Sequence, residues 1–363
     1  MKKIKIGIIG TGVGIRTILP GFRQNAMAEV VGITGRTKER SFYFAKQYNI
    51  PRAYDSYEQM CNDDNIDLIC VCSPNNYHFT QVKYAIKSGK HVLCEKPLTC
   101  KREEVLDLIE LSRNTNKYCI IDHQLRFNPY IRKIKEILDS KEIGKPYFIR
   151  IHQQSMAFAN QNANWSWSFD DAQNGGVRWA MGVHFIDLLL FLLQEDMYNI
   201  SGNMNPVIMQ RADDKQIIRN IKASTLCTAS MISESGIDIK LSVTAAAFSE
   251  PRFDIDIYGE KGEMHFDLVN KIQVFLENEK KQLDEIQGVY NDEKQNKVSI
   301  FSGSFRYFAP LILNAILLKD KKYLKDAASF ESALYTYDIL EDIKIASQEN
   351  CIVKPLNYRR EYI

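Results

Sequence analysis

The sequence predicts two domains: first a doubly wound parallel β-sheet with helices on both faces, then an α+β domain. Three observations lead to this fold class. Short apolar runs alternate with amphipathic stretches in the first third of the chain, longer runs of alternating polarity follow after about residue 122, and 363 residues suffice for two cores. We therefore expect domains at 1–123 and 124–363, the second built on a large, mostly antiparallel open sheet with helices.

The predicted strands of the first domain are short and apolar. They read IKIGIIG, AEVVGITG, IDLICVCS, HVLCE and YCIID and begin at residues 4, 28, 66, 91 and 118. Between the last two lies KREEVLDLIELSRN, which places Val105, Leu108, Ile109 and Leu111 on one helical face with charged residues opposite. Strands and helices that alternate in this way predict a parallel sheet.

The second domain begins with one more amphipathic helix and continues with strand patterns. The runs YFIRIHQQ, STLCTASMI, IDIKLSVTAAA, RFDIDIYG and GEMHFDL alternate in polarity, which is typical of antiparallel strands with one face against a core. Their other face is left to solvent or to a subunit interface. A helix over SFESALYTYDILEDIKIASQE and a short strand CIVKPL follow. FIDLLLFLL, residues 185–193, is far shorter than the roughly 20 residues of a membrane span and predicts a buried helix.

Composition limits the classes of function. The chain is 45% hydrophobic and 25% charged with a net charge of +2, so nothing in it demands a nucleic acid or an anionic membrane as partner. The start MKKIKIGIIG leaves no room for a secretion signal. Eight scattered cysteines without CxxC spacing suggest reduced thiols in a cytoplasmic protein, and no metal site is predicted.

A glycine-rich turn follows the first predicted strand. In GTGVGI, Gly10 permits the tight turn and Gly12 lets the backbone approach a pyrophosphate at the start of a helix, with Thr11 between them. The third glycine of the GxGxxG pattern would fall at Ile15, and Gly14 precedes it. The alternative is a glycine turn without a ligand. Its position after a first strand favours a Rossmann-type dinucleotide site.

The end of the second strand favours NADP, with NAD possible. Dinucleotide folds that bind NAD usually place an acidic residue here, but this chain has Gly35, then Arg36 and Thr37, with Arg40 one turn on. An arginine and a hydroxyl at a helix N-terminus attract a 2′-phosphate, which a carboxylate would repel. The alternative is that Arg36 stacks on adenine and both cofactors bind.

Two further strand ends carry candidate site residues. Ser73, Pro74 and Asn75 follow the third clear strand at its carboxyl end, where ligands bind in open α/β sheets, and His78 either touches the nucleotide or caps the next helix. Further along, Glu95 and Lys96 stand between an apolar run and a proline. Buried charge at such a place needs a partner or a function.

The chain resembles the glucose-fructose oxidoreductase/inositol dehydrogenase (Gfo/Idh/MocA) family over nearly its whole length. The likeness rests on GIIGTGVG, SPNNYH, GKHVLCEKPLT, LRFNP and NGGVRWAMGVHFIDLL, in that order. The resemblance implies that Glu95 lines the nicotinamide ribose and that Lys96 reaches the substrate hydroxyl. It also implies a cis peptide bond before Pro97. A lysine in a cofactor-lined cleft can have its pKa lowered toward the range useful for proton transfer, whereas the alternative is a surface Glu-Lys pair.

The second signature departs from the family pattern. The family's Asp-x-x-x-His places both side chains toward the substrate, but here Ala180 holds the aspartate's position before His184. Lys96 would then be the main acid/base group, with His184 either orienting a substrate hydroxyl or making a structural hydrogen bond. We expect Asp187 to fix the helix or the histidine and not to contact the substrate.

Several residues are candidate substrate contacts. The loop FANQNANWSWSFDDAQNGG is rich in amides and aromatics, which suits a sugar or polyol, although a polar lid with a core-anchored tryptophan is the alternative. Arg126 and Asn128 lie where the family chain crosses between domains. The predicted substrate-binding set is Lys96, Arg126, Asn128, Trp165, Trp167, Trp179 and His184.

These features predict an NADP-preferring oxidoreductase acting on a sugar, cyclitol or sugar-derived carbonyl, with Lys96 and His184 as catalytic residues. Two alternatives stay open. One is a nucleotide-dependent regulator that lost turnover, which Ala180 favours and Lys96 opposes. The other is a redox-neutral enzyme acting on a glycoside with a tightly bound cofactor. An exposed sheet face and the habit of the family suggest a homodimer or homotetramer.

Overall fold

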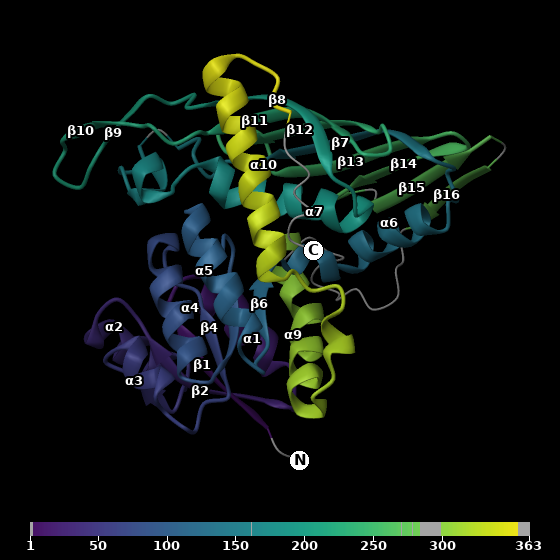
Figure 1. Cartoon of the computed structure of the whole chain (residues 1–363). Helices are drawn as coiled ribbons and strands as arrows, with labels where there is room; N and C mark the ends of the chain where they lie inside the picture. Colours follow the sequence, from purple (N-terminus) through teal and green to yellow (C-terminus); the bar gives the residue numbers. More distant parts are fainter. Residues whose placement is uncertain (1–2, 161, 270, 278, 284–298, 355–363) are drawn as a thin grey trace. The chain divides into compact units, whose positions relative to one another are not determined.

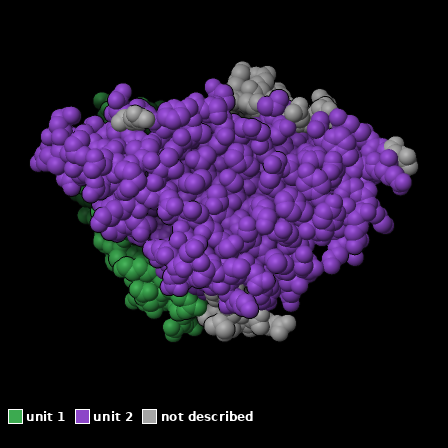
Figure 2. Space-filling model, turned by 90° about the horizontal axis from the view of Figure 1, so that it is seen from above, with its two compact units in different colours: residues 1–128, 291–334 green, residues 129–290, 335–363 purple. Residues whose placement is uncertain are grey.

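The computed structural model describes residues 3–160, 162–269, 271–277, 279–283 and 299–354. The chain forms two compact units, one of residues 1–128 and 291–334, the other of residues 129–290 and 335–363 (Figure 2). The first unit therefore extends five residues beyond the predicted boundary at 123. It also includes the later segment 291–334.

The first unit is built on a six-stranded parallel sheet, as predicted. In the order β3-β2-β1-β4-β5-β6, its strands are Arg52–Ala53, Ala28–Thr34, Ile4–Ile9, Leu68–Val71, His91–Glu95 and Cys119–Asp122. The strand order reverses between β1 and β4, so the carboxyl ends of these two strands form the switch point where ligands bind in such sheets. Four strands have buried interiors that match the predicted apolar runs.

Helices connect the strands of the first unit (Figure 1). They are α1 (Leu19–Arg23), α2 (Lys38–Gln47), α3 (Tyr57–Cys61), α4 (His78–Lys87) and α5 (Arg102–Arg113), with short helical turns at Gly14–Ile18, Asn75–Tyr77 and Gln124–Phe127. The predicted face of α5 is confirmed for Val105, Leu108 and Ile109, which are buried.

Helix α9 (Ile300–Leu318) also belongs to the first unit, although no sequence pattern assigned it there. Phe305, Phe308 and Ile312 are fully buried in the same core as Ile18 and Phe22 of the first βα unit. Phe305 and Phe22 make an edge-to-face ring contact at 5.2 Å. The unit is completed by this returning helix and by the turn Lys321–Leu324, which is why the division differs from the predicted one.

The second unit carries an open eight-stranded sheet. In the order β16-β15-β14-β13-β7-β12-β11-β8, its strands are Glu279–Leu283, Lys271–Leu276, Gly262–Asp267, Arg252–Gly259, Pro146–Gln154, Asp238–Thr244, Leu226–Ser233 and Met197–Asn205. All neighbours are antiparallel except β7 and β12. Burial alternates along β7, β11 and β12, so one face lies against the core, as predicted.

The remaining elements of the second unit are helices and a small hairpin. Helices α6 (Pro129–Asp139) and α7 (Val183–Leu193) lie along one face of the sheet (Figure 1), preceded at α7 by turns at Trp167–Phe169, Asp171–Gln173 and Arg178–Gly182. Strands β9 (Gln210–Ala212) and β10 (Ile218–Asn220) form the hairpin. Helix α10 (Phe330–Glu349) crosses the division of the chain. Of the predicted terminal strand 351–356, Val353 bridges to Ile200, and its last two residues lie outside the described residues.

Two described helices are long and apolar enough to cross a membrane by length and composition. One is Asp171–Leu193, whose most apolar window is 83% buried, and the other is α9. Helices packed into a protein core pass the same test, and α7 is the buried helix predicted over 185–193. All eight cysteines are free, and five of them are buried among apolar side chains.

Candidate functional site

The glycine-rich turn lies at the carboxyl end of β1. Its three glycines serve a tight turn, an open backbone surface and a close helix–strand contact. Gly10 has φ +111°, and a Cβ there would lie 2.3 Å from the carbonyl oxygen of Cys72. A Cβ on Gly12 would meet no atom within 4 Å, so the backbone is open to a ligand. A Cβ on Gly14 would lie 2.6 Å from Ile8 Cγ2, so Gly14 provides the close helix–strand contact that the third glycine usually provides.

Ile15 stands where the GxGxxG pattern has its last glycine, and the helix accommodates it in a π-helical turn. That turn spans Gly14–Ile18, and α1 continues from it. The Ile15 side chain is 5% exposed and belongs to the hydrophobic core of the unit. Its predicted place in the cofactor site is therefore limited to its backbone.

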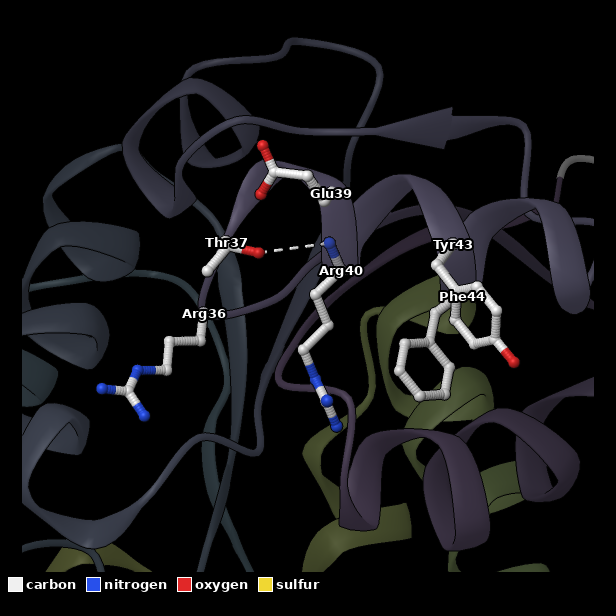
Figure 3. Close-up of a pocket in the computed structure, with 6 residues that line it drawn as sticks. All are labelled: Arg36, Thr37, Glu39, Arg40, Tyr43 and Phe44. Atoms are coloured by element: carbon white, nitrogen blue, oxygen red, sulfur yellow. Dashed lines mark hydrogen bonds between the residues drawn. The ribbon is translucent and has the colours of Figure 1, made fainter.

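A shallow cavity of about 580 Å³ opens at the end of β2, beside the glycine turn in the fold. It is lined by Arg36, Thr37, Glu39, Arg40, Tyr43 and Phe44 (Figure 3). Thr37 is the N-cap of α2, and its hydroxyl accepts a hydrogen bond from the Arg40 backbone N–H at 3.3 Å. Both predicted arginines therefore flank a helix N-terminus, which attracts anions.

The two arginines of this cavity differ in their contacts. Arg40 Nε donates to Thr11 Oγ1 at 2.7 Å, and its guanidinium lies 5.0 Å from the Phe44 ring centre, so it ties the second loop to the glycine turn. Arg36 is exposed and makes no hydrogen bond or ion pair with any part of the chain that the structure describes. Its charge is available to a ligand.

The acidic residue in this cavity does not counter the arginines. Hydrogen bonds from its own backbone N–H and from Thr37 hold the pKa of Glu39 below its ordinary value. In Figure 3 the Glu39 carboxylate points away from both guanidinium groups. Glu39 thus lies in the first turn of α2, where a carboxylate is favourable, and does not take the place of the acidic residue that binds a ribose in NAD sites.

The loop after β4 connects the switch point to the lysine turn. Ser73 Oγ donates to Gln81 Oε1 at 2.6 Å. The buried His78 ring lies with Nε2 2.8 Å from the Ser73 carbonyl and Nδ1 2.8 Å from the Pro97 carbonyl. Burial lowers the pKa of His78 below its ordinary value, although these carbonyls oppose the shift. His78 is the first residue of α4 and not its N-cap. Its contact with the Pro97 carbonyl holds the turn after Lys96 in place.

Lys96 stands at the carboxyl end of β5, next to two buried carboxyls. The Lys96–Pro97 peptide bond is cis, as the family resemblance implies. Glu95 ends β5 and Asp122 ends β6, and the two are direct partners in the parallel ladder. Burial lowers the pKa of Lys96 below its ordinary value, while the charges of Glu95 and Asp122 oppose that shift. A lysine held in this way is suited to exchanging a proton with a ligand.

Arg126 and Asn128 make contacts within the first unit. Arg126 is 6% exposed, and its Nη1 donates to the Asp326 carbonyl at 3.3 Å. Asn128 is fully buried, and its Nδ2 donates to Ser304 Oγ of α9 at 3.0 Å. Between them, Phe127 stacks on Phe308 at 4.1 Å. These contacts fix α9 to the end of β6; a cleft role for either polar residue stays a prediction.

The other predicted site residues belong to the second unit. His184 is 4% exposed in the first turn of α7, with Asp187 one turn on, and both have polar or ring contacts. Trp179 is 1% exposed and stacks with Tyr337 at 5.6 Å, which places it in the core and does not favour a direct substrate contact.

The amide-rich loop of the second unit contains one anchored tryptophan and one exposed tryptophan, so it has features of both predicted alternatives. The Trp165 ring lies under Arg219 at 5.2 Å, and its backbone N–H donates to Ala212, so the β9–β10 hairpin anchors it. Trp167 is 40% exposed and remains accessible to a ligand.

The residue that sequence reasoning missed is Asp122. It ends the apolar run YCIID as Glu95 ends HVLCE, so the signal that singled out Glu95 was present at Asp122 too. In both places a charged residue ends a buried strand, where a charge needs a partner or a function.

The first unit thus combines a switch-point glycine turn, a cavity lined by two arginines, and a lysine beside two carboxyls at the carboxyl end of the sheet, an arrangement typical of a dinucleotide-binding oxidoreductase. Residues 4–123 match the oxidoreductase family with an NAD-binding Rossmann fold, and residues 131–265 match the GFO/IDH/MocA C-terminal domain. The chain belongs to the Gfo/Idh/MocA family of NAD(P)-dependent oxidoreductases, as the sequence predicted.

Named relatives and solved structures agree with this assignment. An uncharacterised oxidoreductase of Synechocystis is 26% identical over 72% of this chain and 71% of its own length. Myo-inositol 2-dehydrogenase of Thermotoga maritima is 24% identical over 76% of this chain and 79% of its own. Levoglucosan dehydrogenase in complex with NADH and L-sorbose has the same fold, with a TM-score of 0.85 and 16% identity over 98% of this chain and 99% of that one.

Proposed function

We propose that this chain is an NADP-preferring oxidoreductase that transfers a hydride to or from a CH–OH carbon of a sugar, a cyclitol or a sugar-derived carbonyl compound. The observation that carries the proposal is Lys96, held beside carboxyls at the sheet edge that also bears the glycine turn. The substrates named for the relatives, myo-inositol and levoglucosan, support a carbohydrate-like ligand.

The residues of the first unit fit a dinucleotide. The open backbone at Gly12 suits a pyrophosphate, and the cavity at Arg36 suits an adenosine ribose. A bound nicotinamide dinucleotide would supply the hydride acceptor or donor. Glu95 would face the nicotinamide ribose, as the family resemblance implies.

Lys96 would exchange the proton that accompanies the hydride. In oxidation its neutral Nζ accepts the proton of the substrate hydroxyl as the adjacent C–H hydrogen leaves as hydride. In reduction its ammonium returns a proton to the carbonyl oxygen. Because burial lowers the pKa of Lys96, both forms of the lysine are accessible at a lower pH than for a free lysine. His184 would orient a second substrate hydroxyl.

Arg36 supports the proposed preference for NADP. Its guanidinium has no partner among the described residues, and Glu39 faces away from it. A 2′-phosphate would gain a charge-assisted hydrogen bond of about 1.5–3 kcal/mol that NAD cannot make. Since Arg40 is already bound to Thr11, Arg36 would provide most of the discrimination.

Fluorescence titration of nucleotide-stripped protein with NADPH and with NADH tests this assignment. Arg36→Ala should weaken NADPH by roughly 1–3 kcal/mol and leave NADH nearly unchanged. Lys46→Ala, at the far end of α2, removes one exposed positive charge as a control and should change neither affinity. Equal losses for both nucleotides in Arg36→Ala would contradict a 2′-phosphate site.

The two alternative functions have their own signatures. Ala180, in place of the family's aspartate, favours a regulator that binds nucleotide without turnover. A panel of sugars and cyclitols assayed with NADP⁺ and NAD⁺ separates these functions: turnover excludes the regulator, and nucleotide that persists through purification favours the redox-neutral enzyme.

We also propose a homodimer or homotetramer formed through the sheet face opposite α6 and α7. On that face the half-buried rings of Phe148, Tyr258, His265 and Phe275 form a stripe of contacts at 5.6–5.7 Å across four strands. Tyr147 beside them is 57% exposed. Light scattering on Phe148→Ser and Phe275→Ser variants tests this interface. The buried free thiols fit the cytoplasmic location that we propose for the protein.

A further inference from the structure

Strands β5 and β6 each end in a carboxylic acid, and the two side chains are neighbours. The ladder pairs Glu95 with Asp122, so their backbones are about 4.8 Å apart and their side chains emerge on the same face. Glu95 is 7% exposed and Asp122 is fully buried. Within the described residues, no N–H or O–H group donates to Glu95 Oε1 or to either carboxyl oxygen of Asp122.

Two buried carboxylates at this separation cannot both be ionised without a large cost. A hydrogen bond between two carboxyls requires a proton on one of them, because an ionised carboxylate can only accept. Burial raises the pKa of Asp122 well above its ordinary value, and the neighbouring charge of Glu95 adds to the shift. Burial also raises the pKa of Glu95, although Lys96 opposes it.

Lys96 and three buried thiols interact electrostatically with this pair. The thiols are Cys70 of β4, Cys94 of β5 and Cys72 of the loop after β4. Burial raises the pKa of all three thiols well above the ordinary value, so they are neutral. The ammonium of Lys96 can balance one carboxylate, so burial favours a proton on the second carboxyl.

We propose that Asp122 is a positioning residue for Lys96: it holds a proton that it shares with Glu95, so that the two carboxyls together carry a single negative charge beside the lysine. The proposal rests on the proposed function in that Lys96 is the group it serves. It adds Asp122, which lies outside the glutamate-lysine-proline triplet, to the residues that act on Lys96.

The shared proton has a consequence for Lys96. Two ionised carboxylates would hold the ammonium strongly and keep its pKa high, which would oppose proton transfer to it. A single shared charge leaves burial able to lower the pKa of Lys96, as the structure indicates. The hydrogen bond from Asp122 also fixes the Glu95 carboxylate in one orientation next to the lysine.

Infrared spectroscopy of the nucleotide-free protein tests the protonation without any turnover. At neutral pH the wild-type protein should show the C=O stretch of a protonated carboxylic acid, and ¹³C labelling of aspartate carboxyls should shift it. The band should vanish in Asp122→Asn and persist in the control Asp67→Asn, which changes a half-buried aspartate directly before β4 that accepts the Lys5 backbone N–H. Absence of a protonated carboxyl in the wild type, or a band that Asp122→Asn leaves unchanged, would overturn the proposal.

Two substitutions at one position separate the shared proton from packing. Asparagine is a neutral hydrogen-bond donor of the same shape, so Asp122→Asn should reduce kcat by less than about tenfold, whereas Asp122→Leu should reduce it about 10- to 100-fold. NADPH affinity should change by less than about threefold in both variants, because neither change touches the nucleotide turn. Equal losses of kcat in the two variants would contradict a role for the proton. If the wild-type protein turns over no sugar or cyclitol, the proposed function fails, while the isotope-labelled infrared spectrum of that protein still decides the shared proton.

Discussion

Replacing Gly12 with alanine should separate nucleotide binding from folding. A Cβ at this position would meet no atom within 4 Å, and the backbone of Gly12 does not lie in the left-handed region. The free protein should therefore tolerate Gly12→Ala and gain at most about 0.4–1 kcal/mol through the lower entropy of the unfolded chain. For a unit of this size that is a rise in Tm of no more than about 2–4 °C.

The same methyl group would occupy the place where a pyrophosphate approaches the backbone. Hydrogen bonds from N–H groups to a charged partner contribute about 1.5–3 kcal/mol, so their loss should weaken binding about 10- to 150-fold. Because both cofactors contain the pyrophosphate, NADPH and NADH should lose affinity equally. This equal loss distinguishes Gly12→Ala from Arg36→Ala.

Two other glycines provide matched comparisons. Gly10→Ala would place a methyl 2.3 Å from a backbone oxygen at φ +111°, so it should lower stability by more than the roughly 1–2 kcal/mol that left-handed backbone alone costs. Gly89→Ala, at φ +69° with no atom within 4 Å, should show only that backbone cost and normal nucleotide affinity. Thermal unfolding and fluorescence titration measure both quantities. Wild-type NADPH affinity in Gly12→Ala would refute the assignment of this turn to the pyrophosphate.

Two further predictions concern single ionisable groups. Lys96→Ala should abolish turnover while leaving NADPH affinity within a few-fold; a loss of binding in the titration would instead make the lysine a cofactor or structural residue. His265 concerns stability: burial lowers its pKa, but hydrogen bonds and the charges of Asp256 and Glu263 outweigh burial and raise it. Because the folded pKa is raised, His265 stabilises the fold below about pH 6.5, and this contribution is lost as the pH rises through the folded value. His265→Gln should therefore lower Tm more at about pH 5.5 than at about pH 9, and an equal loss at both would contradict the reasoning.

Local sequence patterns predicted most strands of the two large sheets. They did not predict that a helix from late in the chain completes the core of the first unit. Alternating apolar runs identified the strands because side-chain burial follows backbone periodicity. Helix α9 is apolar on most sides and contains Pro310, so its pattern does not say which sheet it packs against. The parallel pairing of β7 with β12 was equally unreadable, because alternation is the same in either strand direction.

The candidate site could be predicted where one residue type has one local function. The glycines of the turn and the lysine before Pro97 are such cases. Arg126 and Asn128 show the limit, since their polar groups bind Asp326 and Ser304, which lie far along the chain. Ile15 shows a second limit of prediction from sequence. A π-helical turn places the close helix–strand contact at Gly14, one residue before the position that the GxGxxG pattern predicts.

The position of α9 determines the order in which this protein can be completed during synthesis. The Rossmann-type core needs Phe305 and Phe308, but more than 150 residues of the second unit are translated between β6 and that helix. A nascent or truncated chain ending near Asn128 would expose Ile18 and Phe22 to water and to other chains. The core of the first unit can therefore be completed only after α9 has been synthesised, although its strands come first in the sequence.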